Sequence, residues 1–171
     1  MQSLTIITTG TVKEGYLNEA ISEYKKRLSA FAKIEEIVLK EERIVNEANR
    51  AEIERALAAE GEKILKRIPK DSYKIALCVE GRQYSSEELA AVLKEGSAKD
   101  GKLCLIIGSS HGLSPAVKAA CDLRLSVSKL TFPHQLMRVM LYEILYRSYS
   151  IVAENRIINN ILTTILCIFA L

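Results

Sequence analysis

The feature that most constrains this chain is a regular alternation of short apolar runs with amphipathic or capped segments. The apolar runs predict strands at residues 4–8, 33–39, 73–79, 102–108 and 123–128. The segments between and after them predict helices at residues 17–31, 42–67, 85–93, 115–121 and 133–150. Strands that alternate with helices form a parallel sheet whose faces the helices cover. The sequence therefore predicts one α/β domain with a mostly parallel sheet.

Local signals mark where several of these helices begin and end. Ser85 and Glu88 have the spacing of a capping box. Ser114 and Pro115 supply an N-cap and a first helical residue for the segment that follows them. Pro69 is expected to end the charged helix of residues 42–67.

Length and charge limit the classes of protein that the chain can belong to. Its 171 residues suffice for one domain with a core and are short for two. The 24 basic and 21 acidic residues nearly balance, which permits nucleic-acid binding without arguing for it. The first residues show no signal-peptide pattern, and the apolar run at 161–171 is too short to span a bilayer. We therefore expect a cytoplasmic protein with no membrane partner.

The cysteines show no pattern of a metal site or a disulfide framework. Cys78, Cys104, Cys121 and Cys167 are scattered, without a CxxC pair or a histidine at ligand spacing. Cys78 and Cys104 lie inside apolar runs that predict strands. We expect reduced, buried thiols and no bound metal.

Ligands of parallel sheets bind at the carboxyl ends of the strands, and three such ends carry polar residues and glycines. These ends read CVEGRQ (78–83), IIGSSHG (106–112) and SVSKLTFPHQ (126–135). Gly81, Gly108 and Gly112 would allow close approach of a ligand, although a glycine after a strand is also an ordinary turn residue. The chain lacks GxGxxG after the first strand and lacks GxxxxGK[ST], which disfavours a dinucleotide site and a P-loop.

The predicted helix 133–150 is apolar around most of its circumference. Its apolar residues are Leu136, Met137, Met140, Leu141, Ile144 and Leu145. A single small domain cannot cover so wide a surface, which favours a homodimer interface in addition to a core. Arg138 on this helix is expected to find a phosphate, a carboxylate or a backbone partner.

The segment IIGSSHGLS (106–114), followed by LSVSKLTFPHQLMR (125–138), resembles the SPOUT-class methyltransferases. In detail it resembles the large-subunit rRNA pseudouridine N3-methyltransferase family, and the first strand and helix are similar to that family's opening. The resemblance covers roughly residues 1–151. It implies a single SPOUT methyltransferase domain over 1–151, and it leaves 152–171 as an atypical apolar C-terminal tail.

The resemblance implies properties that periodicity does not show. They are a SPOUT α/β-knot with a C-terminal deep trefoil knot, a homodimer, and S-adenosyl-L-methionine as the cofactor. It also implies that the enzyme methylates N3 of a pseudouridine in large-subunit rRNA on the ribosome. The implied cofactor-binding residues are Leu77, Gly108, Val127, Ser128, Lys129, Leu130, Thr131 and Phe132. A side chain at Gly108 is expected to fill space that the cofactor needs.

His134 and Arg138 are the candidate catalytic residues. Methyl transfer from a sulfonium is an in-line displacement, so the enzyme must align N3 of the base and help to remove its proton. His134 also fits a simpler role as a residue at the start of a helix. The excess of basic residues between 123 and 150 suits an RNA backbone near the site.

Two departures from the family's pattern bear on activity. Ser109 replaces the usual second glycine of a Gly-Gly pair and is expected to adopt φ > 0 less readily, which would weaken cofactor binding. The tail lacks the family's terminal Tyr-His pair. Cofactor binding does not depend on that pair, so we expect its absence to leave binding normal and methyl transfer weak or absent. Two alternatives follow: a catalytically impaired dimeric protein that binds RNA or cofactor, and a SPOUT methyltransferase for another RNA.

Overall fold

Five parallel strands form one sheet in the order β2-β1-β4-β3-β5. The structure, a computed structural model, describes the backbone of residues 2–98 and 100–169 and the side chains of residues 2–98 and 100–154. The strands are β1 (Gln2–Thr9), β2 (Ala32–Leu39), β3 (Tyr73–Arg82), β4 (Lys102–Ile107) and β5 (Leu123–Leu125). Every neighbouring pair runs parallel, which confirms the predicted α/β class.

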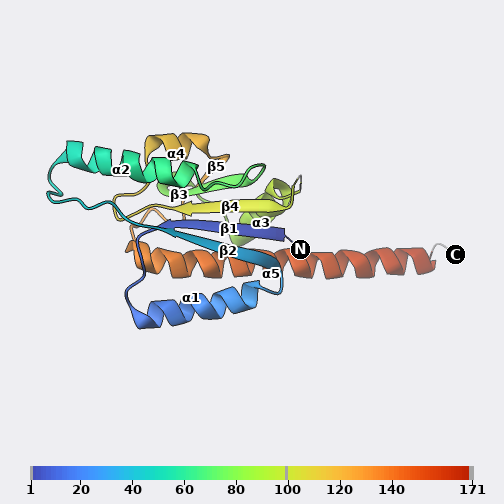
Figure 1. The fold of residues 1–171 in the computed structure, drawn as a ribbon. Helices are drawn as coiled ribbons and strands as arrows, with labels where there is room; N and C mark the ends of the chain where they lie inside the picture. The colour runs from blue at the N-terminus through green and yellow to red at the C-terminus, as the bar shows by residue number, and fades with distance from the viewer. Residues whose placement is uncertain (1, 99, 170–171) are drawn as a thin grey trace.

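Helices cover both faces of the sheet (Figure 1). They are α1 (Gly15–Leu28), α2 (Arg50–Leu65), α3 (Ser86–Gly96), α4 (Pro115–Ala120) and α5 (His134–Phe169). One face carries α1 and α5, and α3 packs against α5, whereas α2 and α4 lie together on the other face. No helix in the described part of the chain is long and apolar enough to cross a membrane.

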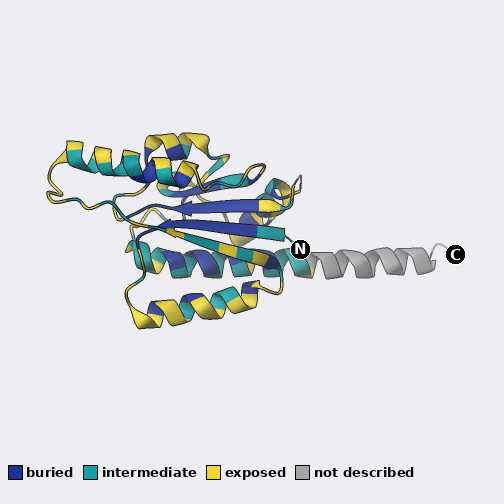
Figure 2. Cartoon of the chain, viewed as in Figure 1, coloured by how far each residue is buried: buried dark blue, intermediate teal, exposed yellow. Residues whose placement is uncertain are grey.

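The core consists of two layers, one on each face of the sheet. Successive strand residues point to opposite faces, so Ile6 belongs to the layer under α1, α3 and α5, and Ile7 to the layer under α2 and α4. Strand β4 divides in the same way, with Leu105 in the first layer and Ile106 in the second. The central strands are dark along most of their length in Figure 2, as expected for a sheet buried on both sides.

The predicted caps of α3 and α4 are confirmed. Ser85 and Glu88 exchange both hydrogen bonds of the capping box at the start of α3. The Ser114 hydroxyl accepts from the Val117 N–H, and Pro115 occupies the first turn of α4.

The prediction of a helix from residue 42 was wrong for its first turns, because α2 begins at Arg50. Side chains satisfy the backbone of the preceding segment in place of a helix. The Glu52 carboxylate accepts from the N–H groups of Val45 and Asn46, and the Asn49 side chain caps α2 by accepting from the Glu52 N–H. These contacts offer the backbone an alternative to helical hydrogen bonds.

The last two predicted elements also have different bounds. Strand β5 ends at Leu125 and not at residue 128, because the chain turns at Ser126. Helix α5 begins at His134, one residue after the predicted start at Pro133, and continues to Phe169, beyond the predicted end at residue 150. The atypical apolar tail expected over 152–171 lies mostly outside the residues whose side chains the structure describes.

Candidate functional site

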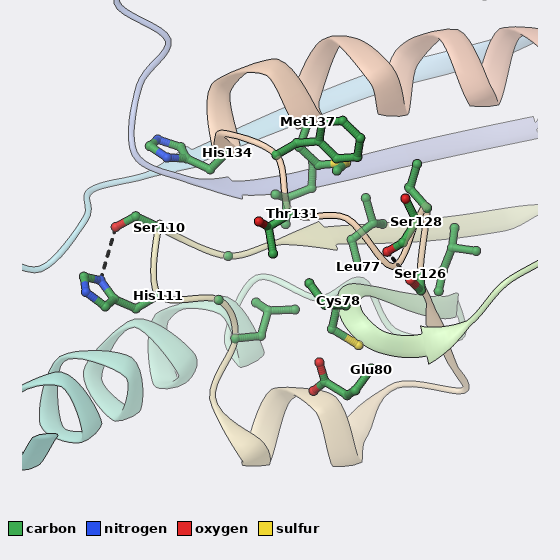
Figure 3. Close-up of a pocket in the computed structure, with 18 of the residues that line it drawn as sticks. Leu77, Cys78, Glu80, Ser110, His111, Ser126, Ser128, Thr131, His134 and Met137 are labelled. Atoms are coloured by element: carbon green, nitrogen blue, oxygen red, sulfur yellow. Dashed lines mark hydrogen bonds between the residues drawn. The ribbon is translucent and has the colours of Figure 1, made fainter.

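A cavity of about 430 Å³ opens at the carboxyl ends of the central strands. Three segments that are far apart in the sequence form most of its wall: the end of β3 at 77–80, the loop 107–113 after β4, and the segment 125–134 between β5 and α5. Figure 3 shows His134, Ser110 and His111 at one end of the cavity and Ser126 and Ser128 at the other. The parallel sheet brings these segments together, because all its strands end at the same edge.

The structure gathers most of the expected cofactor residues around this cavity. Seven of the eight line it: Leu77, Gly108, Val127, Ser128, Leu130, Thr131 and Phe132. Lys129, the eighth, is exposed and is not part of the wall. Of the two candidate catalytic residues, His134 lines the cavity and Arg138 does not.

Local hydrogen bonds shape the segment that follows β5. The Ser126 N–H donates to the Arg82 carbonyl over 2.9 Å, which ties the end of β5 to β3. The Ser126 hydroxyl donates to the Ser128 carbonyl, and the Ser128 hydroxyl accepts from the Leu130 N–H, both over 3.0 Å. Serine side chains therefore hold this turn, and Leu130, 70% exposed, stands at the rim of the cavity.

The loop after β4 turns back on itself between Gly108 and Gly112. A Cβ atom on Gly108 would stand 2.0 Å from the Gly112 carbonyl oxygen. The Gly112 N–H donates to the Ser109 carbonyl over 2.9 Å, and Gly112 itself has φ of +87°. A side chain at Gly108 would therefore meet the other limb of the turn, in addition to any ligand space that it fills.

Ser109 is compatible with this loop without backbone strain. Among the described residues Asp71 is the single non-glycine residue with positive φ, so the expected strain at Ser109 does not occur. The Ser109 side chain is buried, and its hydroxyl donates to the Glu60 carboxylate of α2 over 2.9 Å. The hydroxyl thus has a partner within the protein.

At one end of the cavity, imidazole and hydroxyl groups of the wall lie near the carboxylate of Glu41, which is outside the lining. The Ser110 hydroxyl lies 3.1 Å from Nδ1 of His111 and 3.3 Å from Oε1 of Glu41. His134 approaches the same place from the start of α5: its Nε2 would be 3.8 Å, and Glu41 Oε2 3.1 Å, from a Cβ atom on Gly10. Groups that accept and donate protons thus converge at this end.

Arg138 is buried beneath this end of the site, with 3% of its surface exposed. Its guanidinium donates to the carbonyl of Thr9 over 3.1 Å and to the carbonyl of Gly10. Of the three kinds of partner expected for this arginine, a phosphate, a carboxylate or a backbone group, the structure shows the backbone one. Burial lowers the pKa of Arg138, and the hydrogen bonds hold the chain where it leaves β1.

The wall also carries residues that sequence reasoning missed, namely Cys78, Glu80, Lys118 and Met137. Glu80 and Lys118 form an ion pair of 2.5 Å, and the hydrogen bond from Lys118 lowers the pKa of Glu80. Burial raises the pKa of the Cys78 thiol. Cys78 and Glu80 lie one and three residues after Leu77, in a strand end that the sequence already predicted as a ligand position. No sequence signal predicts that Lys118 lies in the cavity wall.

The character of the wall limits the ligands that fit. The cavity lies in the size range of small-molecule sites, which is roughly 300–1,000 Å³. Leu77, Leu125, Val127 and Phe132 supply apolar surface, and the glycine-containing loop brings backbone groups to the wall. No group of three or more His, Cys, Asp or Glu side chains suited to a metal ion occurs among the residues described. The lining therefore suits an organic ligand with an apolar ring and polar substituents.

Comparison with known proteins places the chain in a family. A family model described as "Predicted SPOUT methyltransferase" matches residues 2–156. A protein of Caldicellulosiruptor saccharolyticus named ribosomal RNA large subunit methyltransferase H is 45% identical over 149 residues, which are 87% of this chain and 95% of that protein. The protein of the same name from Clostridioides difficile is 44% identical over 150 residues, covering 87% of this chain and 94% of the relative.

Solved structures support the same assignment at the level of the fold. A probable methylase family protein from Haemophilus influenzae aligns with a TM-score of 0.54 and 16% identity, covering 91% of this chain and 70% of that one. A probable methyltransferase from Bordetella pertussis aligns with a TM-score of 0.53 and 16% identity, covering 86% and 96%. The match of the family model over residues 2–156 and the identity with these relatives show that the chain belongs to the SPOUT methyltransferase family.

Proposed function

We propose that this chain is a cytoplasmic methyltransferase that uses S-adenosylmethionine to methylate N3 of a pseudouridine in large-subunit rRNA on the assembled ribosome. The observation that carries the proposal is the cavity at the strand ends, around which seven of the eight residues expected to bind the cofactor gather. The relatives named ribosomal RNA large subunit methyltransferase H support the rRNA substrate.

The wall of the cavity fits the cofactor in polarity and in size. The apolar side chains of Leu77, Val127 and Phe132 would flank the adenine, and the backbone of the loops 107–113 and 126–132 would bind its edge. When bound, the cofactor supplies an electrophilic methyl group carried on a sulfonium. The protein contributes the orientation of the two reactants and the exclusion of water.

His134 is the proposed residue that acts on the proton of the target base. It lines the cavity at the end where Ser110 and His111 also lie, so its imidazole is near the place where a base would enter (Figure 3). Arg138 has a different proposed role, because its guanidinium is occupied by the Thr9 and Gly10 carbonyls. It would hold the turn at Gly10 against which His134 stands.

The trefoil knot and the homodimer are part of the same proposal. The segment 126–133 would form a loop of the knot between β5 and α5. Met140 and Ile144 of α5 are only partly buried within the protomer, and they line a surface hollow of about 460 Å³ together with Tyr84 and Leu89. An apolar hollow on a helix of this kind suits a twofold-related copy.

The test is methyl transfer to ribosomes that lack the modification, followed by mass spectrometry of the rRNA nucleosides. N3-methylpseudouridine in the large-subunit rRNA supports the proposal, and a methylated nucleoside in another RNA identifies a different substrate. Cofactor binding without transfer identifies the impaired binding protein. In that case, replacing the residues after Ile151 with a short tail that ends in Tyr-His-Lys is expected to restore transfer.

A further inference from the structure

Glu60 is a buried carboxylate for which the proposed reaction has no use. It lies on α2, outside the cavity wall, and only 4% of its surface is exposed. Among the ion pairs formed by the described residues, none includes Glu60. Burying a carboxylate without a cation is costly unless hydrogen bonds compensate, so the retained carboxylate requires an explanation.

Both oxygens of this carboxylate accept hydrogen bonds from segments outside α2. Oε1 accepts from the Glu42 N–H over 2.8 Å, in the segment that connects β2 to α2. Oε2 accepts from the Ser109 hydroxyl over 2.9 Å, in the loop that lines the cavity. Glu60 therefore joins three parts of the chain, and one of them is the proposed cofactor loop.

The next residue explains how α2 comes close enough for this contact. A Cβ atom on Gly61 would stand 2.2 Å from the Ser114 hydroxyl oxygen and 3.4 Å from the Val117 side chain. Glycine at this position thus allows α2 to pack directly against the end of the loop and the start of α4. The Glu60 carboxylate then lies against the loop at Ser109.

We propose that Glu60 is a positioning residue for the cofactor loop: through Ser109 it holds the loop 108–113 in the shape that binds S-adenosylmethionine. The role rests on the proposed function for the identity of the ligand, but the contact itself involves this chain alone. Burial raises the pKa of the Glu60 carboxyl, and the bonds from Glu42 and Ser109 oppose that rise. These bonds therefore offset part of the cost of burying the ionised carboxylate.

The experiment compares Glu60→Ala and Ser109→Ala with two control variants of α2. Glu62→Gln changes an exposed carboxylate on the same helix. Ile64→Val removes one methyl group from the core layer that Ile64 shares with Leu113, and it removes no hydrogen bond to the loop. Two quantities are measured for each full-length variant: hydrogen exchange of the 108–113 peptide without ligand, and the Kd for S-adenosylmethionine by calorimetry below the unfolding temperature.

Glu60→Ala and Ser109→Ala are each expected to speed exchange in the loop and to raise the Kd about tenfold, with no further rise in the double variant. The controls are expected to leave loop exchange and Kd unchanged, even where Ile64→Val lowers the unfolding temperature. If hydrogen exchange of the 108–113 peptide in Glu60→Ala equals that of wild type, the inference is overturned. It is also overturned if the Kd of every variant, controls included, rises in proportion to its loss of thermal stability.

The two proposals fail in different ways. If the unaltered protein does not bind S-adenosylmethionine, the cofactor assignment fails, while the exchange data still decide whether Glu60 holds the loop. If the unaltered protein binds and the Kd of Glu60→Ala is unchanged, the cofactor assignment stands and the positioning role is wrong.

Discussion

Replacing Gly108 with alanine is the sharpest test of the turn that builds the site. The new Cβ atom would stand 2.0 Å from the Gly112 carbonyl oxygen and 2.4 Å from its carbonyl carbon. The obstacle is backbone, so it cannot rotate away as the end of a long side chain can. To reach an ordinary contact distance, one limb of the turn must move by about 1 Å or more.

The cost of this movement can be estimated from two terms. Overpacking a closely packed site costs about 1–3 kcal/mol. Separation of the two limbs would also break the hydrogen bond from the Gly112 N–H to the Ser109 carbonyl, at about 0.5–1.5 kcal/mol. We expect the free energy of unfolding to fall by about 1.5–4.5 kcal/mol, and we expect S-adenosylmethionine binding to be lost because the loop changes shape.

Gly15→Ala is the matched control for the same chemical change. A Cβ atom on Gly15, the first residue of α1, would meet nothing within 4 Å. This variant should be neutral or more stable by up to about 1 kcal/mol. Urea unfolding measures both variants, and calorimetry measures binding where each is folded. Wild-type stability in Gly108→Ala would refute the described turn, and unchanged binding would remove this loop from the cofactor site.

Three further measurements test the dimer, the buried carboxylate and the cavity. Met140→Asp should yield monomeric or insoluble protein, because the proposed twofold interface cannot bury a new carboxylate; a stable wild-type monomer in light scattering would contradict the interface. Burial raises the pKa of Glu60 in the folded protein above its value of about 4.5 in the unfolded chain, so the folded protein holds this proton more tightly. The contribution of Glu60 to stability is therefore complete at pH values below about 4.5 and is lost as pH rises through the pKa of the folded protein. The free energy of unfolding of wild type minus that of Glu60→Gln should therefore fall as pH rises above about 4.5, and a flat or rising difference would contradict this reasoning. Alkylation of Cys78 at alkaline pH, followed by peptide mapping, should slow when S-adenosylmethionine is added, because Cys78 lines the cavity; equal rates with and without the ligand would place the ligand elsewhere.

The elements that the sequence predicted well depend on neighbours along the chain. The capping box of Ser85 and Glu88 and the Ser114–Pro115 start of α4 are contacts across three residues or fewer, so their spacing alone predicts them. The alternation of strand and helix patterns predicted the parallel sheet, and the sheet then places the three polar strand ends at one edge. The errors at the start of α2 and the end of β5 occur where polar side chains form hydrogen bonds with backbone groups, in place of the helix or strand hydrogen bonds that the pattern predicted.

The sequence by itself determined the α/β class, the family and most of the residues around the cavity, because each of these depends on periodicity or on a contiguous motif. Tertiary structure alone decided the partners of the polar groups. Ser109 and Glu60 are 49 positions apart, and Arg138 and Thr9 are 129 apart. Such pairs form only after the sheet order and helix packing are set, since a hydrogen bond requires its two groups within about 3 Å of each other. The contiguous motifs at the strand ends therefore reveal where the site is, and the tertiary fold decides which hydrogen bonds hold the site in shape.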